Sequence, residues 1–237
     1  MESARTGVSV ESDGFAIVKR VLDSATIEGL IEAFTAVTER LDSEASVGVY
    51  AVRNLLEEVP AVAALGASAV LRSLVTPVLG NAAKLVRALL FDKIPGANWK
   101  VPWHQDLTIA VRERREVPGF GPWSVKAGVL HVQPPPEVLE RMLAVRLHLD
   151  DCPDTNGALR VIPASHKVGR LTSQRIQEIS AGSKPVWCSA RAGDALLMRP
   201  LLLHASSPSH TPHHRRVIHI EYAGVELRGG LEWFANG

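Results

Sequence analysis

The segment Trp103-His104-Gln105-Asp106 contains a histidine and an aspartate two residues apart. In an extended strand, side chains at positions i and i+2 point to the same face, so His104 and Asp106 can reach one metal ion together. Two ligands alone hold an ion weakly, and such a pair on its own is often incidental. A metal site therefore requires a third ligand from elsewhere in the chain.

His204 is the strongest candidate for the third ligand among the nine histidines. It ends the apolar run Leu201-Leu202-Leu203, which follows a predicted strand at residues 195–199, so we expect it at a strand end near the mouth of a barrel. Two histidines and one carboxylate on one face of a metal suit non-heme Fe(II). They leave room for a bidentate co-substrate and for O₂.

Arg215 and Ser206 are candidates to bind that co-substrate. Arg215 precedes Arg216 at the start of a predicted strand at residues 217–222. An arginine there can form a bidentate salt bridge with a dicarboxylate whose other end chelates the iron. Adjacent strand residues face opposite sides, so only one of the two arginines points inward. Ser206 can add a hydroxyl to the same carboxylate, or it can be only a turn residue before Pro208.

The pattern from residue 83 onward predicts the scaffold that positions these residues. Short alternating or apolar segments are separated by prolines and glycines, which indicates a β-rich half. This density of strands favours a double-sheet jelly roll, that is, a cupin-like double-stranded β-helix. We expect strands at residues 84–91, 109–112, 125–133, 143–150, 159–162, 185–189, 195–199 and 217–222.

The first 82 residues are predicted to be mainly helical. Apolar residues recur at helical spacing from Ile27 to Leu41, and further helices are expected to begin at Pro60 and after Ser68. The expected fold is mainly β with flanking α-helices. It comprises one domain, residues 1–237, in which a helical part at 1–82 packs on one sheet of a jelly-roll core at 83–223.

Charge and composition argue against several classes of partner. The chain has 26 Lys and Arg against 25 Asp and Glu, a net charge of +1, so no strong field favours nucleic acid or a membrane surface. We expect a small-molecule substrate. The amino terminus lacks an apolar signal core, and every apolar run is too short to span a bilayer. Both observations favour a cytoplasmic protein. Cys152 and Cys188 are too few for a disulfide framework.

Several segments together carry a resemblance to a known family. They are the Trp-His-Gln-Asp segment, Leu149-Asp150-Asp151 leading into Asn156-Gly157-Ala158-Leu159, the loop Ile162-Pro163-Ala164-Ser165-His166-Lys167, and Gly193-Asp194 followed by His204-Ala205-Ser206 and Arg215. In this combination they resemble the phytanoyl-CoA dioxygenase-like family of Fe(II)- and 2-oxoglutarate-dependent oxygenases. One departure is Ala164, where the family usually has glycine.

The resemblance implies a site and a reaction. His104, Asp106 and His204 would bind iron, Arg215 with Ser206 would hold the far carboxylate of 2-oxoglutarate, and Trp123 would line the co-substrate pocket. In this family, 2-oxoglutarate is decarboxylated to succinate while O₂ oxidises a small organic molecule. Halogenating relatives replace the carboxylate ligand by a small residue, so the presence of Asp106 favours hydroxylation or a related oxidation.

Arg146, His148, His131 and Lys93 are candidates for substrate contact, and Arg87 is a further one. Arg146 and His148 share one strand face, His131 lies on another, and Lys93 and Arg87 precede the metal motif. Two other functions are compatible with the same ligands. One is a cupin-like isomerase or hydrolase that does not use 2-oxoglutarate, and the other is a catalytically idle binding or sensing protein.

Overall fold

The computed structural model of the chain describes residues 2–44, 51–93, 98–210 and 214–235. Its largest sheet has six strands, and every pairing within it is antiparallel. In spatial order these strands are β1 (Phe15–Val18), β11 (Ala195–Met198), β8 (Met142–His148), β13 (Arg216–Ala223), β3 (Lys84–Asp92) and β2 (Ala51–Val52).

Two smaller antiparallel sheets complete the β structure of the described residues. The four-stranded sheet contains β10 (Val186–Cys188), β9 (Leu159–Val161), β12 (His204–Ser206) and β4 (Val101–His104) in that order. The three-stranded sheet contains β5 (Ile109–Val111), β7 (Val129–Val132) and β6 (Trp123–Lys126). The predicted fold class, a jelly-roll core with flanking helices, is confirmed.

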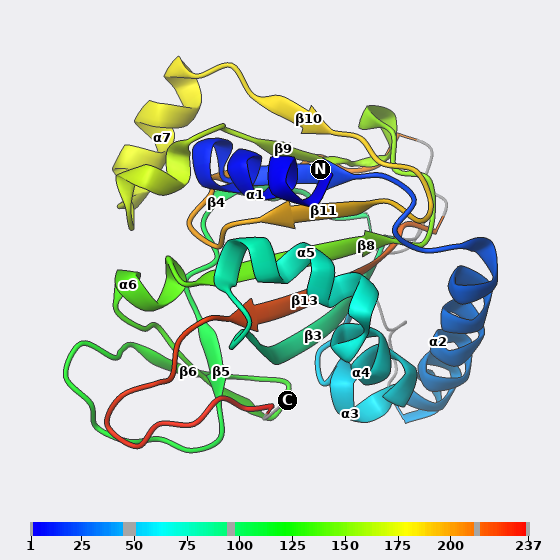
Figure 1. Cartoon of the computed structure of the whole chain (residues 1–237), viewed down its shortest axis with the longest axis horizontal. Helices are drawn as coiled ribbons and strands as arrows, with labels where there is room; N and C mark the ends of the chain where they lie inside the picture. Colours follow the sequence, from blue (N-terminus) through cyan, green and yellow to red (C-terminus); the bar gives the residue numbers. More distant parts are fainter. Residues whose placement is uncertain (1, 45–50, 94–97, 211–213, 236–237) are drawn as a thin grey trace.

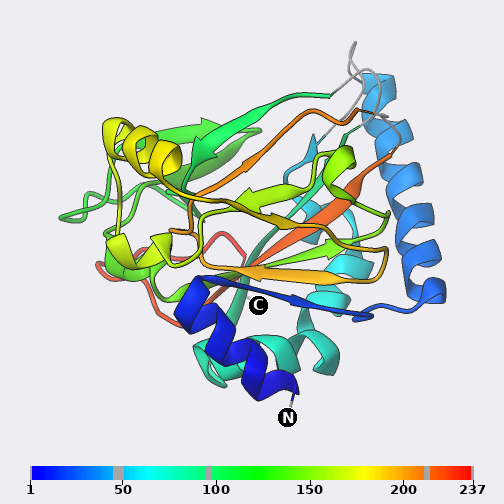
Figure 2. The same cartoon turned by 90° about the horizontal axis from the view of Figure 1, so that it is seen from above.

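The amino-terminal helices cover one face of the six-stranded sheet, and the smaller sheets lie on its other side (Figures 1 and 2). The apolar residues of β3, β8, β11 and β13 that point toward these helices form the main hydrophobic core with them. The side chain of Ser68 caps α5, as predicted, by accepting a hydrogen bond from Leu71 N. The helices are α1 (Glu2–Asp13), α2 (Ser24–Glu44), α3 (Leu55–Glu58), α4 (Pro60–Ala67) and α5 (Ala69–Leu79).

In the described part of the chain after α5, two α-helices and two short 3₁₀ turns connect the strands. The helix α7 (Ser173–Gly182) was not predicted, and neither was α1. The remaining elements are α6 (Pro136–Leu139), η1 (Asp154–Asn156) and η2 (Ser165–Val168).

The predicted single strand at residues 125–133 is wrong. Ala127 and Gly128 have φ angles of 48° and 75° and form a turn, so the segment folds back as the hairpin of β6 and β7. Two consecutive residues with positive φ are typical of a tight hairpin turn, whose twist matches the strands on either side.

Within the described residues, no single helix has the length and apolar composition needed to cross a membrane. Helices α4 and α5 satisfy that requirement only as a pair, which is bent by 54° at the junction.

Candidate metal centre

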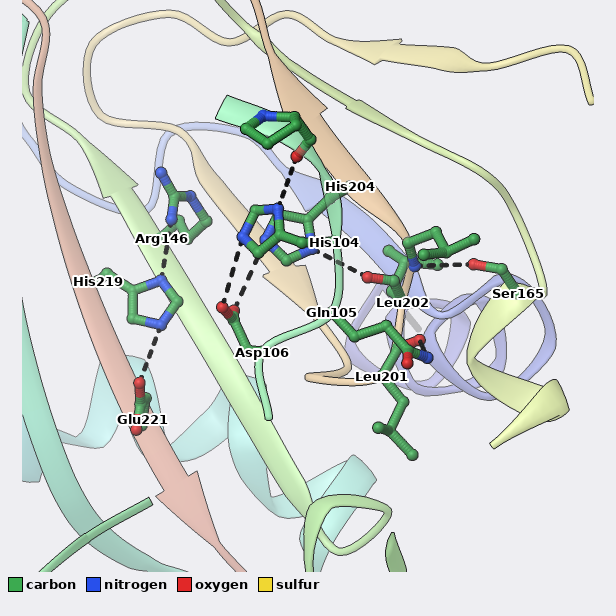
Figure 3. A network of polar contacts seen from close by, with 12 residues as sticks. His104, Gln105, Asp106, Arg146, Ser165, Leu201, Leu202, His204, His219 and Glu221 are labelled. Carbon is green, nitrogen blue, oxygen red and sulfur yellow. Dashed lines mark hydrogen bonds and ion pairs between the residues drawn. The ribbon is translucent and has the colours of Figure 1, made fainter. Parts of the chain in front are cut away.

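Strand pairing brings the two predicted histidine ligands together. β12 pairs with β4 so that His204 lies opposite His104, and the centroids of the two rings are 4.1 Å apart. Asp106 follows β4, and one ligand atom from each of the three residues lies within 4.8 Å of the others (Figure 3). Three potential ligands that are distant in sequence therefore meet at one point.

Gln105 fixes the turn between His104 and Asp106. Its buried side-chain amide donates to the carbonyl oxygen of Leu201 at 2.7 Å (Figure 3) and to that of Gly169 at 2.8 Å, and its oxygen accepts from Leu171 N at 2.9 Å. The Asp106 backbone N–H donates to Pro200 O at 2.9 Å. No role was predicted for Gln105 from the sequence, although its position between two candidate ligands is a signal for one.

The hydrogen bonds of the histidines direct their free nitrogens toward Asp106. Nδ1 of His104 lies 2.9 Å from Pro102 O, and Nδ1 of His204 lies 2.9 Å from Leu202 O. A carbonyl can only accept, so each Nδ1 carries the proton and each Nε2 presents a lone pair. These Nε2 atoms lie 3.8 and 3.6 Å from the Asp106 carboxylate oxygens. Three converging lone-pair donors fit a divalent cation.

The protonation states also favour metal binding. Burial lowers the pKa of His204 to about 4, so its imidazole is neutral at neutral pH. Burial alone would raise the pKa of the Asp106 carboxyl, but the neighbouring His204, His219 and His104 outweigh it and lower that pKa to about 2. The site therefore offers a carboxylate and a neutral imidazole, the forms that bind metals.

The three residues open into a cavity of about 230 Å³. Alternate residues of β3 line it, because successive side chains of a strand point to opposite faces. Its described lining contains two carboxylates, those of Asp106 and Glu221, against six lysines and arginines. The lining residues are Arg53, Arg87, Leu89, Phe91, Lys93, Trp99, Val101, His104, Asp106, Thr108, Lys126, Arg146, Leu159, His204, Ser206, Arg215, His219 and Glu221.

One end of the cavity combines Lys93, Ser206 and Arg215. All three are buried, and Lys93 Nζ donates to Ser206 Oγ at 3.2 Å and to Ser207 O at 2.8 Å. Burial, followed by the charge of Arg215, lowers the pKa of Lys93 to about 8. Two cations thus share a buried position that contains no carboxylate partner among the described lining residues.

The surroundings of Arg215 leave part of its guanidinium free. One Nη donates to Gly157 O, whereas the buried Nε has no hydrogen-bond partner in the described structure. Gly157 has a φ of 66°, and a Cβ there would lie 2.7 Å from Ser207 O and 3.4 Å from Lys93 Nζ. Glycine is therefore required beside this cation pair. An unsatisfied buried N–H of an arginine fits an incoming anion.

The choice between the adjacent arginines is clear from the geometry. Arg216 forms a bidentate ion pair with Asp150, at 2.9 Å from Nε and 2.6 Å from Nη2, and is absent from the described cavity lining. The backbone N–H and carbonyl of Arg215 pair with those of Lys93, so β3 and β13 bring these two residues together. Arg215 is the inward-facing residue.

The other candidates fall into two groups. Arg146 lines the cavity with Lys93, and its Nη1 lies 2.9 Å from Nδ1 of His219, which in turn lies 3.3 Å through Nε2 from Glu221 (Figure 3). Trp123, His131 and His148 are outside the described lining.

Each of those three has other surroundings. Trp123 packs against an apolar cluster with the Arg114 guanidinium 5.5 Å from its ring centroid. His131 is on β7 and contacts Val129 O through Nδ1, and His148 is buried on β8.

The sequence model of the phytanoyl-CoA dioxygenase family matches residues 10–217, which is most of the chain and includes all three candidate ligands. The chain belongs to the phytanoyl-CoA dioxygenase family. This assignment confirms the resemblance inferred from the motifs. None of the curated proteins compared with the chain matches it significantly.

Solved structures share the fold of this phytanoyl-CoA dioxygenase family member at low sequence identity. AviO1 from Streptomyces viridochromogenes Tue57 is 23% identical with a TM-score of 0.68, over 93% of this chain and 94% of that one. EctD from S. alaskensis with bound Fe is 19% identical with a TM-score of 0.71, over 93% and 76%. The epimerase SnoN, in complex with Fe³⁺, alpha ketoglutarate and nogalamycin RO, is 16% identical with a TM-score of 0.66, over 100% and 94%.

Proposed function

We propose that this chain is an Fe(II)- and 2-oxoglutarate-dependent oxygenase that oxidises a small organic molecule. The observation that carries the proposal is a single cavity that contains both the ligand atoms of His104, Asp106 and His204 and the buried cation pair Lys93 and Arg215. A dicarboxylate with a 2-oxo acid at one end suits both features. One end chelates a metal, and the other neutralises two cations that have no carboxylate partner among the described lining residues.

Each residue has a defined role in this proposal. His104, Asp106 and His204 hold Fe(II) on one face. Arg215 binds the far carboxylate of 2-oxoglutarate through its guanidinium, and Ser206 donates its hydroxyl to the same group. When bound, the iron and 2-oxoglutarate supply the capacity to activate O₂, with release of succinate and CO₂. The protein orients both groups and excludes water from the buried end.

Family membership and the printed descriptions of similar structures support these cofactors. EctD is described with bound Fe, and SnoN with Fe³⁺ and alpha ketoglutarate. We propose hydroxylation as the outcome because Asp106 keeps a carboxylate at the metal. Epimerisation is a second candidate, since SnoN is described as an epimerase.

The cavity disfavours the two functions that do not use 2-oxoglutarate. A cupin-like isomerase or hydrolase needs the three ligands but has no use for a buried lysine and arginine that meet no carboxylate in the described cavity lining. A catalytically idle protein has no need for a complete ligand set in the protonation states that bind metal. The charge arrangement therefore favours a co-substrate that is both a chelator and an anion.

Succinate release tests this function. The full chain is incubated with Fe(II), 2-oxoglutarate and O₂ against a panel of small molecules, with His104→Ala as the inactive variant. His210→Ala is the matched control, because His210 is an exposed histidine outside the described cavity lining. We expect stimulated succinate release from wild type and His210→Ala only. Conversion of a panel compound without succinate formation would instead identify an enzyme that does not use 2-oxoglutarate.

A further inference from the structure

The cavity has a second cationic end, opposite the Lys93, Ser206 and Arg215 cluster. Arg87, Leu89, Phe91 and Lys93 are alternate residues along β3 and its extension, and all four line the cavity. Lys93 lies six positions after Arg87, which corresponds to about 20 Å along an extended strand. On the neighbouring strand β13, Glu221 pairs beside Arg87, and Arg215, directly before β13, pairs beside Lys93. The two charged groups therefore lie at opposite ends of one cavity wall, which β3 and β13 form.

Three cations from three elements meet at this second end. Arg53 follows β2, Arg87 is on β3, and Lys126 is the last residue of β6. Nζ of Lys126 donates to Thr108 Oγ1 at 3.0 Å. Glu221 is the one carboxylate of the described lining at this end. It lies 3.5 Å from Arg87 and 3.3 Å from His219. Glu221 is thus already paired with Arg87 and His219. The described ion pairs at this end include no carboxylate partner for Arg53 or Lys126.

Electrostatics at this end match the geometry. Burial lowers the pKa of Lys126, and the charges of Arg87 and Arg53 lower it further. Asp106 and Glu221 act in the opposite direction on the same lysine, so the cluster lies within electrostatic reach of the candidate metal site. Positive charges held close together in a partly buried cavity repel one another, and a bound anion would relieve this repulsion.

We propose that the prime substrate carries an anionic oxyacid group, a carboxylate or a phosphate-type group, bound by Arg53 and Lys126 with support from Arg87. This inference rests on the proposed function, in which 2-oxoglutarate occupies the Lys93 and Arg215 end. The anionic group would anchor the substrate at the Arg53 and Lys126 end of this cavity wall. The rest of the substrate would then lie over the metal ligands. A cationic substrate would meet repulsion at the same position.

Binding of three small probes to the full chain tests the inference. The protein is loaded with Ni²⁺ and saturating 2-oxoglutarate, which blocks the opposite end. It is then titrated with acetate, methylphosphonate or acetamide, and broadening of the probe's methyl line gives each affinity. Acetate and acetamide have nearly the same shape and differ in charge. Acetate and methylphosphonate separate a carboxylate site from a phosphate-type site.

The variants Lys126→Met and Arg53→Met remove one charge each from the proposed site. Lys184→Met is the matched control, because Lys184 is exposed and outside the described cavity lining. We expect at least one anion to bind about tenfold more tightly than acetamide, and each site variant to weaken that anion about tenfold. Lys184→Met should leave the affinity unchanged. If Lys126→Met does not fold, the bend residue Arg53 provides the independent variant.

Three results would overturn the inference: equal binding of acetate and acetamide, anion binding that survives both site variants, or no anion binding at all. The absorbance band of the Fe(II) and 2-oxoglutarate complex reports separately on the proposed function. If that band is missing, the oxygenase proposal fails, and the comparison of Arg53 and Lys126 variants in the unloaded protein still decides the anion site.

Discussion

His104 and His204 lie opposite each other where β4 and β12 pair, with ring centroids 4.1 Å apart. The pairing register places both rings on one face beside Asp106, and a shift of one residue would turn one ring to the opposite face. Beyond His204 the register shifts before Ser206. The candidate metal centre is therefore a property of strand register.

Replacing Arg215 by leucine should selectively weaken 2-oxoglutarate binding. The change removes a buried charged donor with a free Nε, so we expect a loss of about 10- to 100-fold in affinity, with iron affinity nearly unchanged. Arg216→Leu is the matched control, because Arg216 pairs with Asp150. Calorimetric titration measures both. Weaker 2-oxoglutarate binding in Arg216→Leu than in Arg215→Leu would contradict this assignment.

Gln105→Ala should weaken iron binding although Gln105 is not a ligand. Its amide fixes the turn between His104 and Asp106 through three hydrogen bonds. Loss of a group that orients ligands typically lowers metal affinity about 10- to 100-fold. Competition with a chelator measures this loss, and Gln174→Ala, an exposed glutamine on α7, is the control. Wild-type iron affinity in a folded Gln105→Ala protein would exclude this positioning role.

Acidification should destabilise the fold through buried histidines. Burial lowers the pKa of His131 and of His148 to about 4, below the value of about 6.5 for an unfolded histidine. Between these values the unfolded chain binds more protons, so stability is present above about pH 6.5 and is lost as the pH falls toward 4. We expect a loss of about 1–2 kcal/mol per histidine between about pH 7.5 and pH 5.

Urea unfolding at the two pH values tests this prediction. His131→Phe should lose less unfolding free energy on acidification than wild type, whereas His210→Phe, at an exposed histidine, should lose the same amount as wild type. An equal loss in all three proteins would show that His131 does not titrate as described.

Ala164→Gly should stabilise the protein. Ala164 has a φ of 62°, in the left-handed region that costs an alanine about 1–2 kcal/mol, and glycine recovers this cost less its larger entropy in the unfolded chain. We expect a net gain of about 0.5–1 kcal/mol in the free energy of unfolding. Ala181→Gly, in α7, should instead destabilise by up to about 1 kcal/mol. A destabilised Ala164→Gly protein would mean that the turn depends on the alanine methyl group.

His104, Asp106 and His204, which the structure brings together, could be predicted as candidate metal ligands because each depends on a local signal. One signal is a two-residue spacing in a strand, and the other is a histidine at the end of an apolar run. Both remain recognisable even when the boundaries of neighbouring elements are predicted wrongly. The segment at 125–133 misled because Val125, Val129 and Val132 suit strands and the turn at Ala127 and Gly128 lacks the usual asparagine or aspartate. The helix α7 contains no buried residue, so no strong apolar stripe marks it.

Other parts of the site could not be read from sequence. Arg53 and Lys126 reach the cavity from elements whose neighbours depend on the three-dimensional fold. The roles of Trp123, His131 and His148 as pocket residues stay predictions, and these residues lie outside the described lining. A single-domain organisation and a cytoplasmic location also stay predictions.

The central claim is that His104, Asp106 and His204 hold an iron that 2-oxoglutarate chelates. Anaerobic addition of Fe(II) and 2-oxoglutarate should give a visible charge-transfer band in wild type and in His210→Ala. The band should be lost in His104→Ala and in Asp106→Ala while both variants remain folded. An unchanged band in these two variants would contradict the assignment of the metal ligands.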